Sequence, residues 1–319
     1  MVSLKRLLLV AAAVLAVAVS ALLIARAWGS GAPARVATIA IAPARPATGA
    51  APRPPQHALV LARQAGDLAV AVALRHARLG ARAWVTVLRS DGAGLDRARV
   101  AIRLGSAPAR RAAPCGHGCY AVRFGGPSGA RRLDVVVTPE GGRAHAASFA
   151  LPLRWPLPAA SVVAGAARAL RSAHSVVYRE RLSSGLGAVV RTTFRELAPG
   201  SLTYAIRGGS AAVIVGSRRW DRTSAGGRWA ASAQQPLELP ARPWGAHPYD
   251  ASLLARGPRT VTVSFYDPVT PAWYEVVLDR RTRRPRRVAM TAAAHFMRDV
   301  YVAYDLPLRI RPPRAAYTP

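Results

Sequence analysis

Hydrophobic residues between positions 58 and 150 fall into short runs, and turn-forming residues such as Asp91-Gly92 separate these runs. The runs either alternate with polar residues or are continuously apolar, which is typical of strands and not of helices. About seven short strands in such a span predict an immunoglobulin-like β-sandwich over residues 58–150. The clearest predicted strands are 67–74, 83–88, 98–104, 119–124 and 133–138.

A second block follows a proline-rich connector. Residues 151–158 contain three prolines, which exclude a regular helix or a central strand, so we expect a hinge there. Hydrophobic residues then recur at helical spacing, which predicts a helix over about 159–173 with Ser161 as a candidate N-cap.

The rest of the chain, to residue 315, is predicted to be almost entirely strands joined by tight turns. The predicted strands are 175–182, 188–197, 202–207, 211–217, 220–223, 228–233, 260–267, 273–279, 287–296 and 299–304. One helix followed by consecutive antiparallel strands predicts a curved sheet wrapped over the helix. The chain is therefore expected to be mainly β, with a concave apolar interior in residues 159–315.

The N-terminal residues indicate the compartment. Leu7–Ala25 is an uncharged, apolar run of 19 residues behind Lys5 and Arg6. As a helix it would be about 28 Å long, so residues 1–28 predict a transmembrane signal anchor; cleavage after the run remains an alternative. Residues 29–57 predict a Pro/Ala-rich linker. We expect a single-pass protein of the cell membrane with most of the chain outside the cytoplasm.

The charge balance at first suggests nucleic acid as a partner. The chain has 45 Lys+Arg against 15 Asp+Glu, a net charge of +30. Arginine supplies nearly all of it, because Lys5 is the single lysine, and this pattern indicates biased composition. Together with the predicted location it argues against nucleic acid. One local cluster of arginines predicts contact with anionic lipid or acidic wall polymer, and a solvated turn is the alternative. Its members are Arg280, Arg281, Arg283, Arg284, Arg286 and Arg287.

Two groups of residues offer metal-binding chemistry. Cys115, His117 and Cys119 suit Cu(I) or Zn(II) if the thiols are reduced, whereas outside the cytoplasm the two cysteines favour a disulfide. His295 and Met297 share one face of a predicted strand, with Met290 on the other face unless a bulge intervenes. An imidazole and a thioether suit Cu(I); ordinary half-buried strand residues are the alternative.

Aromatic residues concentrate in the second block. If these residues line the concave interior, they form a binding site for an apolar chain; the alternative is that they are ordinary hydrophobic core residues. The candidates are Trp220, Trp229, Trp244, Phe265, Trp273 and Phe296.

Catalytic signatures are missing. The sequence has no phosphate-binding glycine loop, no Gly-x-Ser-x-Gly and no His-Glu-x-x-His, so we expect a non-catalytic protein. The acidic residues of the second block show no isolated pair, and most are expected to pair with arginines.

Several strings together resemble the extracytoplasmic C-terminal region of actinobacterial CopC/CopD-type copper-resistance membrane proteins. They are Cys115–Tyr120, Ile214–Gly216 with Arg219–Arg222, Phe265–Pro268 with Pro271–Trp273, and Met290–Met297. The first block also resembles FixH/YtkA-type sandwiches, and the second resembles the LolA/LppX half-barrel, which carries lipid ligands.

The resemblance implies two functions. The first is capture of an apolar, lipid-like envelope ligand in the half-barrel. The alternative is a copper-binding or copper-sensing accessory module that works with a CopD-type transporter. This chain has one apolar span where a CopD-type domain has several, so we do not expect it to move copper by itself.

Overall fold

The computed structural model describes residues 52–125, 129–185, 187, 189–246, 248–314 and 316–317. The predicted anchor, residues 1–28, and most of the predicted linker, 29–57, lie outside the described residues. Within the described ranges, no helix is long and apolar enough to cross a membrane. The described chain is mainly β, with one α-helix and large antiparallel sheets.

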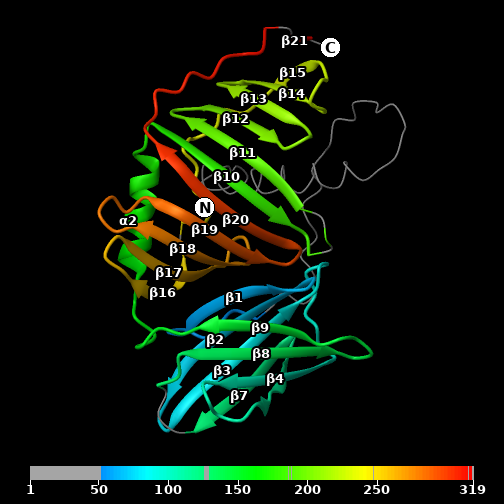
Figure 1. The fold of residues 1–319 in the computed structure, drawn as a ribbon, viewed down its shortest axis with the longest axis vertical. Helices are drawn as coiled ribbons and strands as arrows, with labels where there is room; N and C mark the ends of the chain where they lie inside the picture. Colours follow the sequence, from blue (N-terminus) through cyan, green and yellow to red (C-terminus); the bar gives the residue numbers. More distant parts are fainter. Residues whose placement is uncertain are drawn as a thin grey trace, which may run out of the picture. The chain divides into compact units, whose positions relative to one another are not determined.

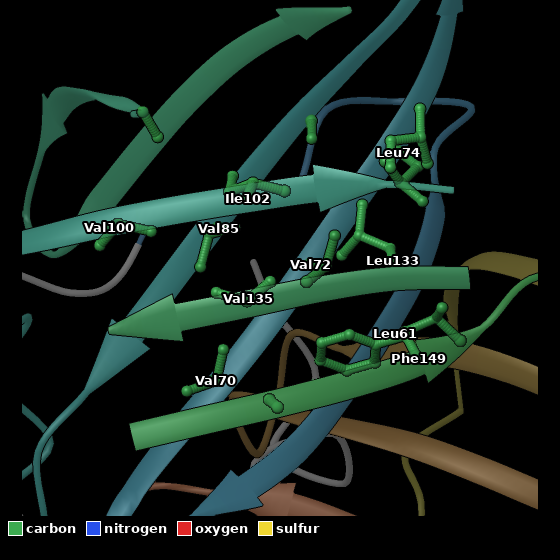
Figure 2. Close-up of a cluster of buried hydrophobic side chains, with 14 of the residues drawn as sticks. Leu61, Val70, Val72, Leu74, Val85, Val100, Ile102, Leu133, Val135 and Phe149 are labelled. Atoms are coloured by element: carbon green, nitrogen blue, oxygen red, sulfur yellow. The ribbon is translucent and has the colours of Figure 1, made fainter. Parts of the chain in front are cut away.

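The first nine strands form two sheets that pack face to face, here called the sandwich module. One sheet has the order β1-β2-β3-β7-β6 and the other β5-β4-β8-β9. Figure 2 shows the core between them, where the apolar side chains of alternate strand positions meet. The strands are β1 (Leu59–Ala65), β2 (Leu68–Ala77), β3 (Gly80–Leu88), β4 (Ala98–Leu104), β5 (Arg110–Arg111), β6 (Ala113–Gly116), β7 (Cys119–Gly125), β8 (Arg132–Pro139) and β9 (His145–Ala150).

The remaining strands form one twelve-stranded sheet, here called the large sheet, which α2 (Ala160–Arg171) accompanies along one side (Figure 1). Its order is β16-β17-β18-β19-β20-β10-β11-β12-β13-β14-β15-β21. The strands are β10 (Ser175–Ser183), β11 (Val189–Leu197), β12 (Ser201–Ile206), β13 (Ala211–Val215), β14 (Arg218–Arg222), β15 (Trp229–Ala233), β16 (Tyr249–Arg256), β17 (Thr260–Asp267), β18 (Ala272–Asp279), β19 (Pro285–Ala292), β20 (His295–Tyr304) and β21 (Ala316–Tyr317).

The two faces of the large sheet have different partners. Leu170 of α2 packs with Ala173 and Val176, so the face that carries Val176 is here called the α2 face. The opposite face, here called the sandwich face, carries Tyr266 and Trp273, which pack on the sandwich module. Because side chains alternate along a strand, neighbouring residues of β17 and β18 point to opposite faces, as Phe265 and Tyr266 do.

Strand β1 is buried on both of its faces. Leu59 and Leu61 point into the core of the sandwich module, while Val60 and Ala62 join a second core with the large sheet. Strand β2 repeats the pattern, with small side chains toward the large sheet: Ala69, Ala71 and Ala73. These alanines let the two backbones approach closely, so aromatic side chains of the large sheet fill the remaining space.

An ion pair adds a polar contact between the two parts. Arg63 Nη2 lies 2.8 Å from Glu275 Oε2, joining β1 to β18. The backbone N–H of His57 also donates to Asp250 Oδ1 at 2.8 Å.

Three details differ from the sequence expectations. The N-cap of α2 is Ala159, and no side chain caps it, so Ser161 lies inside the helix. Strand β16 was not predicted. The last hairpin turns at Ala293–Ala294, between β19 and β20, and not near residue 298 as the predicted strand boundaries imply.

The buried contact between the large sheet and the sandwich module generates a stability prediction. Trp273 is 4% exposed and packs in the shared core, so Trp273→Ala leaves a cavity there. We expect it to lower the free energy of unfolding by roughly 3–5 kcal/mol, measured by denaturant titration. Trp229→Ala is the control, because Trp229 is half-buried and stacks on Arg222, and should cost much less. Equal losses in both variants would contradict the role of this core.

Candidate functional site

A groove of about 380 Å³ opens beside α2. The helix supplies one wall through Val163, Ala164 and Ala167. The opposite wall comes from the segment before β16, through Trp244 and Pro248. The volume lies within the range of about 300–1,000 Å³ that is typical of small-ligand pockets, and both walls carry apolar side chains.

The helix wall follows from the periodicity of the sequence. Val163, Ala166, Ala167 and Leu170 recur at three- and four-residue intervals and are buried, while Ala164 is exposed at the groove. Small side chains on this stripe leave room beside the helix.

The opposite wall is held by aromatic packing on the α2 face of the large sheet. The ring of Trp244 meets Phe265 and Tyr274 edge to face, with centroids 5.8 and 6.4 Å apart. The Tyr274 hydroxyl donates to the carbonyl of Pro243, and the N–H of Gly245 donates to Asp267. Trp244 is 4% exposed, so it is a fixed part of the wall.

Three guanidinium groups line the same groove: Arg168 and Arg171 from α2, and Arg242 from the opposite wall. Burial lowers the pKa of Arg242, and the nearby charge of Arg171 lowers it further, whereas Asp267 acts in the opposite direction. The groove therefore combines apolar walls with positive charge.

A second polar cluster lies on the α2 face of the large sheet. Glu180 of β10 stands directly opposite Asp299 of β20. Glu196 of β11 lies nearby and accepts hydrogen bonds from the Tyr178 hydroxyl at 3.2 Å and the Ala241 N–H at 3.1 Å. Sequence reasoning expected most acids of this block to pair with arginines, but within the described residues these three form no ion pair.

Burial changes the protonation of these carboxyl groups. It raises the pKa of Glu180 to about 7 and that of Glu196 to about 7. Burial, and then the neighbouring Glu180 and Glu196, raise the pKa of Asp299 well above its usual range. Asp299 is 2% exposed, and its Oδ1 has no hydrogen-bond partner among the described residues.

Aromatic rings form a row beside these carboxyl groups. Tyr178 stacks on Phe194 at 4.7 Å and on Tyr301 at 5.3 Å, and Tyr301 stacks on Tyr304 at 5.8 Å. A bulge in the β10–β20 pairing places Tyr301 and Tyr304, three positions apart, on one face. The sequence does not predict this row of rings, because the bulge breaks the two-residue alternation of side chains along β20.

The structure separates the predicted aromatic candidates. Trp244 and Phe265 lie on the α2 face, and Trp244 lines the groove. Trp273 and Phe296 lie on the sandwich face and pack against the sandwich module, so they do not line the concave interior that was expected.

The other two tryptophans lie away from the groove. Trp220 pairs with Val213, on the face of the large sheet opposite the α2 face, and is 6% exposed. Trp229 on β15 stacks on Arg222. Neither residue lines the groove beside α2.

Cys115 and Cys119 form a disulfide across the β6–β7 turn, which confirms the favoured alternative. Gly116, His117 and Gly118 at this turn all have positive φ. The two sulfurs are bonded to each other and are not thiolate ligands, so the Cys115-His117-Cys119 metal site is not formed in this state.

The last hairpin brings the two methionines together. Met290 and Met297 are cross-strand partners on one face, contrary to the expectation that Met290 lies on the opposite face. His295 lies two positions before Met297, and its buried Nε2 has no hydrogen-bond partner in the described structure. Across the described ranges, no group of three His, Cys, Asp or Glu side chains is placed to hold a metal ion.

The predicted arginine cluster surrounds the β18–β19 turn. Arg284 pairs with Asp305, and Arg286 pairs with Asp279 at 2.6 Å. The remaining members form no ion pair within the described residues: Arg280, Arg281, Arg283 and Arg287. Two of the six charges are thus compensated locally.

Comparisons with known proteins do not assign this chain to a family. No protein-family model matches the chain, and no curated protein does. Among solved structures, a LolA superfamily protein from Nitrosomonas europaea is similar at 13% identity, covering 49% of this chain and 96% of its own, with a TM-score of 0.24. This likeness is too weak to support a function.

The raised pKa values of these carboxyl groups generate a pH prediction. Glu180 and Glu196 have pKa values near 7 when folded, against 4.5 for an ordinary glutamate. The folded protein therefore binds more protons than the unfolded chain between these values, and stability should fall as pH rises from about 4.5 to 7. Denaturant unfolding across this range measures it.

Matched variants identify the source of the pH effect. Glu180→Gln and Glu196→Gln should each flatten the fall in stability, because glutamine does not titrate. Glu140→Gln is the control, since the Glu140 side chain is 72% exposed on the sandwich module. If the glutamine variants keep the wild-type slope, the carboxyl groups are not buried in solution.

Proposed function

We propose that this protein is a non-catalytic binding protein that holds the apolar chain of a lipid-like ligand in the groove beside α2. One observation supports this most strongly: a groove of about 380 Å³ that is lined in part by apolar side chains opens between α2 and the segment before β16. A LolA/LppX-like carrier is the finer form of this proposal. It rests on the groove and not on the weak structural likeness.

Burial of an apolar chain supplies the binding energy. Each methylene of a ligand that is buried in the groove contributes about 0.8 kcal/mol. The wall around Trp244 is already packed and hydrogen-bonded, so binding requires little ordering.

The proposal includes a location outside the cytoplasm, on a membrane anchor formed by residues 1–28. The disulfide between Cys115 and Cys119 supports it, because such bonds persist mainly in oxidising compartments. Envelope lipids are present there as ligands.

A neutral apolar dye tests the groove. N-phenylnaphthylamine should bind with a saturable rise in fluorescence, and dodecanol should displace it. Ala164→Trp fills the groove from its exposed edge and should weaken binding about tenfold, or about 1.4 kcal/mol. Ser161→Trp places the same side chain on the same helix at an exposed residue that does not line the groove and should leave binding unchanged. Equal binding by both variants would contradict this site.

A second candidate function, binding of a cuprous ion, is favoured by the last hairpin. Met290 and Met297 are directly opposed, and the nearby His295 has a buried Nε2 without a partner. Two thioethers and one imidazole are soft ligands that suit Cu(I). In this form the protein would serve as an accessory module for a CopD-type copper transporter.

Competition with a cuprous chelator, in ascorbate, tests this candidate. The wild type should take up one equivalent of Cu(I), and Met290→Leu, Met297→Leu and His295→Ala should each weaken uptake at least tenfold. His174→Ala is the control, because this exposed histidine lies away from the hairpin. Copper uptake that is the same in all four variants and the wild type would remove the candidate.

A further inference from the structure

The arginines of the groove have no acidic partners. Within the described residues, Arg168, Arg171 and Arg242 form no ion pair, although the groove brings them together from two separate segments. Elsewhere in the described chain, eight ion pairs join arginines to carboxylates. The groove therefore holds three guanidinium groups outside any ion pair, and Asp267 acts on Arg242 without pairing with it.

The nearby carboxylates are engaged with other groups. Asp267 accepts hydrogen bonds from Gly245 N at 2.7 Å, Val269 N at 3.0 Å and Thr270 Oγ1 at 2.9 Å. Glu196 accepts from Ala241 N and the Tyr178 hydroxyl. Neither carboxylate is within ion-pair distance of an arginine of the groove.

The helix explains part of this arrangement. Arg168 and Arg171 lie in the last turn of α2, where positive charge interacts favourably with the helix dipole. Arg242 has no such explanation, because it comes from the facing wall and is half-buried beside Arg171. Two guanidinium groups on opposite walls repel each other unless an anion lies between them.

We propose that the groove selects a single-chain amphiphile with an anionic headgroup, carboxylate or phosphate, whose apolar chain lies along Val163, Ala167 and Trp244 while Arg171 and Arg242 hold the head. This inference rests on the proposed function and adds the charge of the ligand. Planar guanidinium groups form paired hydrogen bonds with the oxygens of such anions. A groove of about 380 Å³ lies at the lower end of the usual pocket range, which favours one chain over two.

Ligands that share one chain and differ in the headgroup test the inference. Isothermal titration of the wild type should show dodecanoate and dodecyl phosphate binding about tenfold or more tightly than dodecanol, with an advantage that shrinks as salt is added. Arg171→Gln and Arg242→Gln should each remove most of this advantage, with a much smaller effect on the binding of dodecanol than on that of dodecanoate. Arg207→Gln, an exposed arginine outside the groove, is the control and should behave like the wild type.

The outcomes separate this inference from the proposed function. If dodecanol binds as tightly as dodecanoate in every variant, the headgroup contact is overturned and the apolar groove stands. If none of the three amphiphiles binds, both are overturned. If inorganic phosphate alone binds as tightly as dodecyl phosphate, the groove is a site for a free anion and the inference is overturned. Dodecanoate should change the tryptophan fluorescence of the wild type. Loss of this change in Trp244→Phe supports binding beside Trp244.

Discussion

The two-sided burial of strands β1 and β2 is the constraint on which the rest of the structure depends. Alternate side chains of β1 enter two different cores, Leu59 and Leu61 on one side and Val60 and Ala62 on the other. Separating the sandwich module from the large sheet would therefore expose apolar side chains of β1 and β2 to water. This contact covers the sandwich face of the large sheet at β16 to β20 and leaves the α2 face for the helix and the groove.

Much of the fold follows from local patterns in the sequence. The continuously apolar run of β2 and the helical spacing of α2 predicted both elements close to their observed bounds. Strand β16 was missed because it is an edge strand that contains small and polar residues and two irregularities in its pairing. The turn at Ala293–Ala294 was missed because alanine gives no turn signal, although Ala294 adopts a φ of 54°.

The candidate site was harder to predict, since it depends on strand register and on distant segments. Trp244 was among the predicted ligand-binding residues, but the sequence gives no sign that Arg242 meets Arg171 across a groove. Likewise Glu180 and Asp299 each have arginine neighbours in the sequence, which suggested ion pairs. On a strand, adjacent residues point to opposite faces, so these arginines lie on the other side of the sheet from the carboxyl groups.

The large sheet also determines how rigid the groove is. Three of its strands hold the backbone of the facing wall: Glu196 of β11 accepts from Ala241 N, Tyr274 of β18 donates to the carbonyl of Pro243, and Asp267 of β17 accepts from Gly245 N. Buried polar groups thus position a segment that has no regular secondary structure of its own. Because the sheet already fixes Arg242 and Trp244, an anionic amphiphile would meet a formed wall, and less of its binding energy would be lost to ordering the protein.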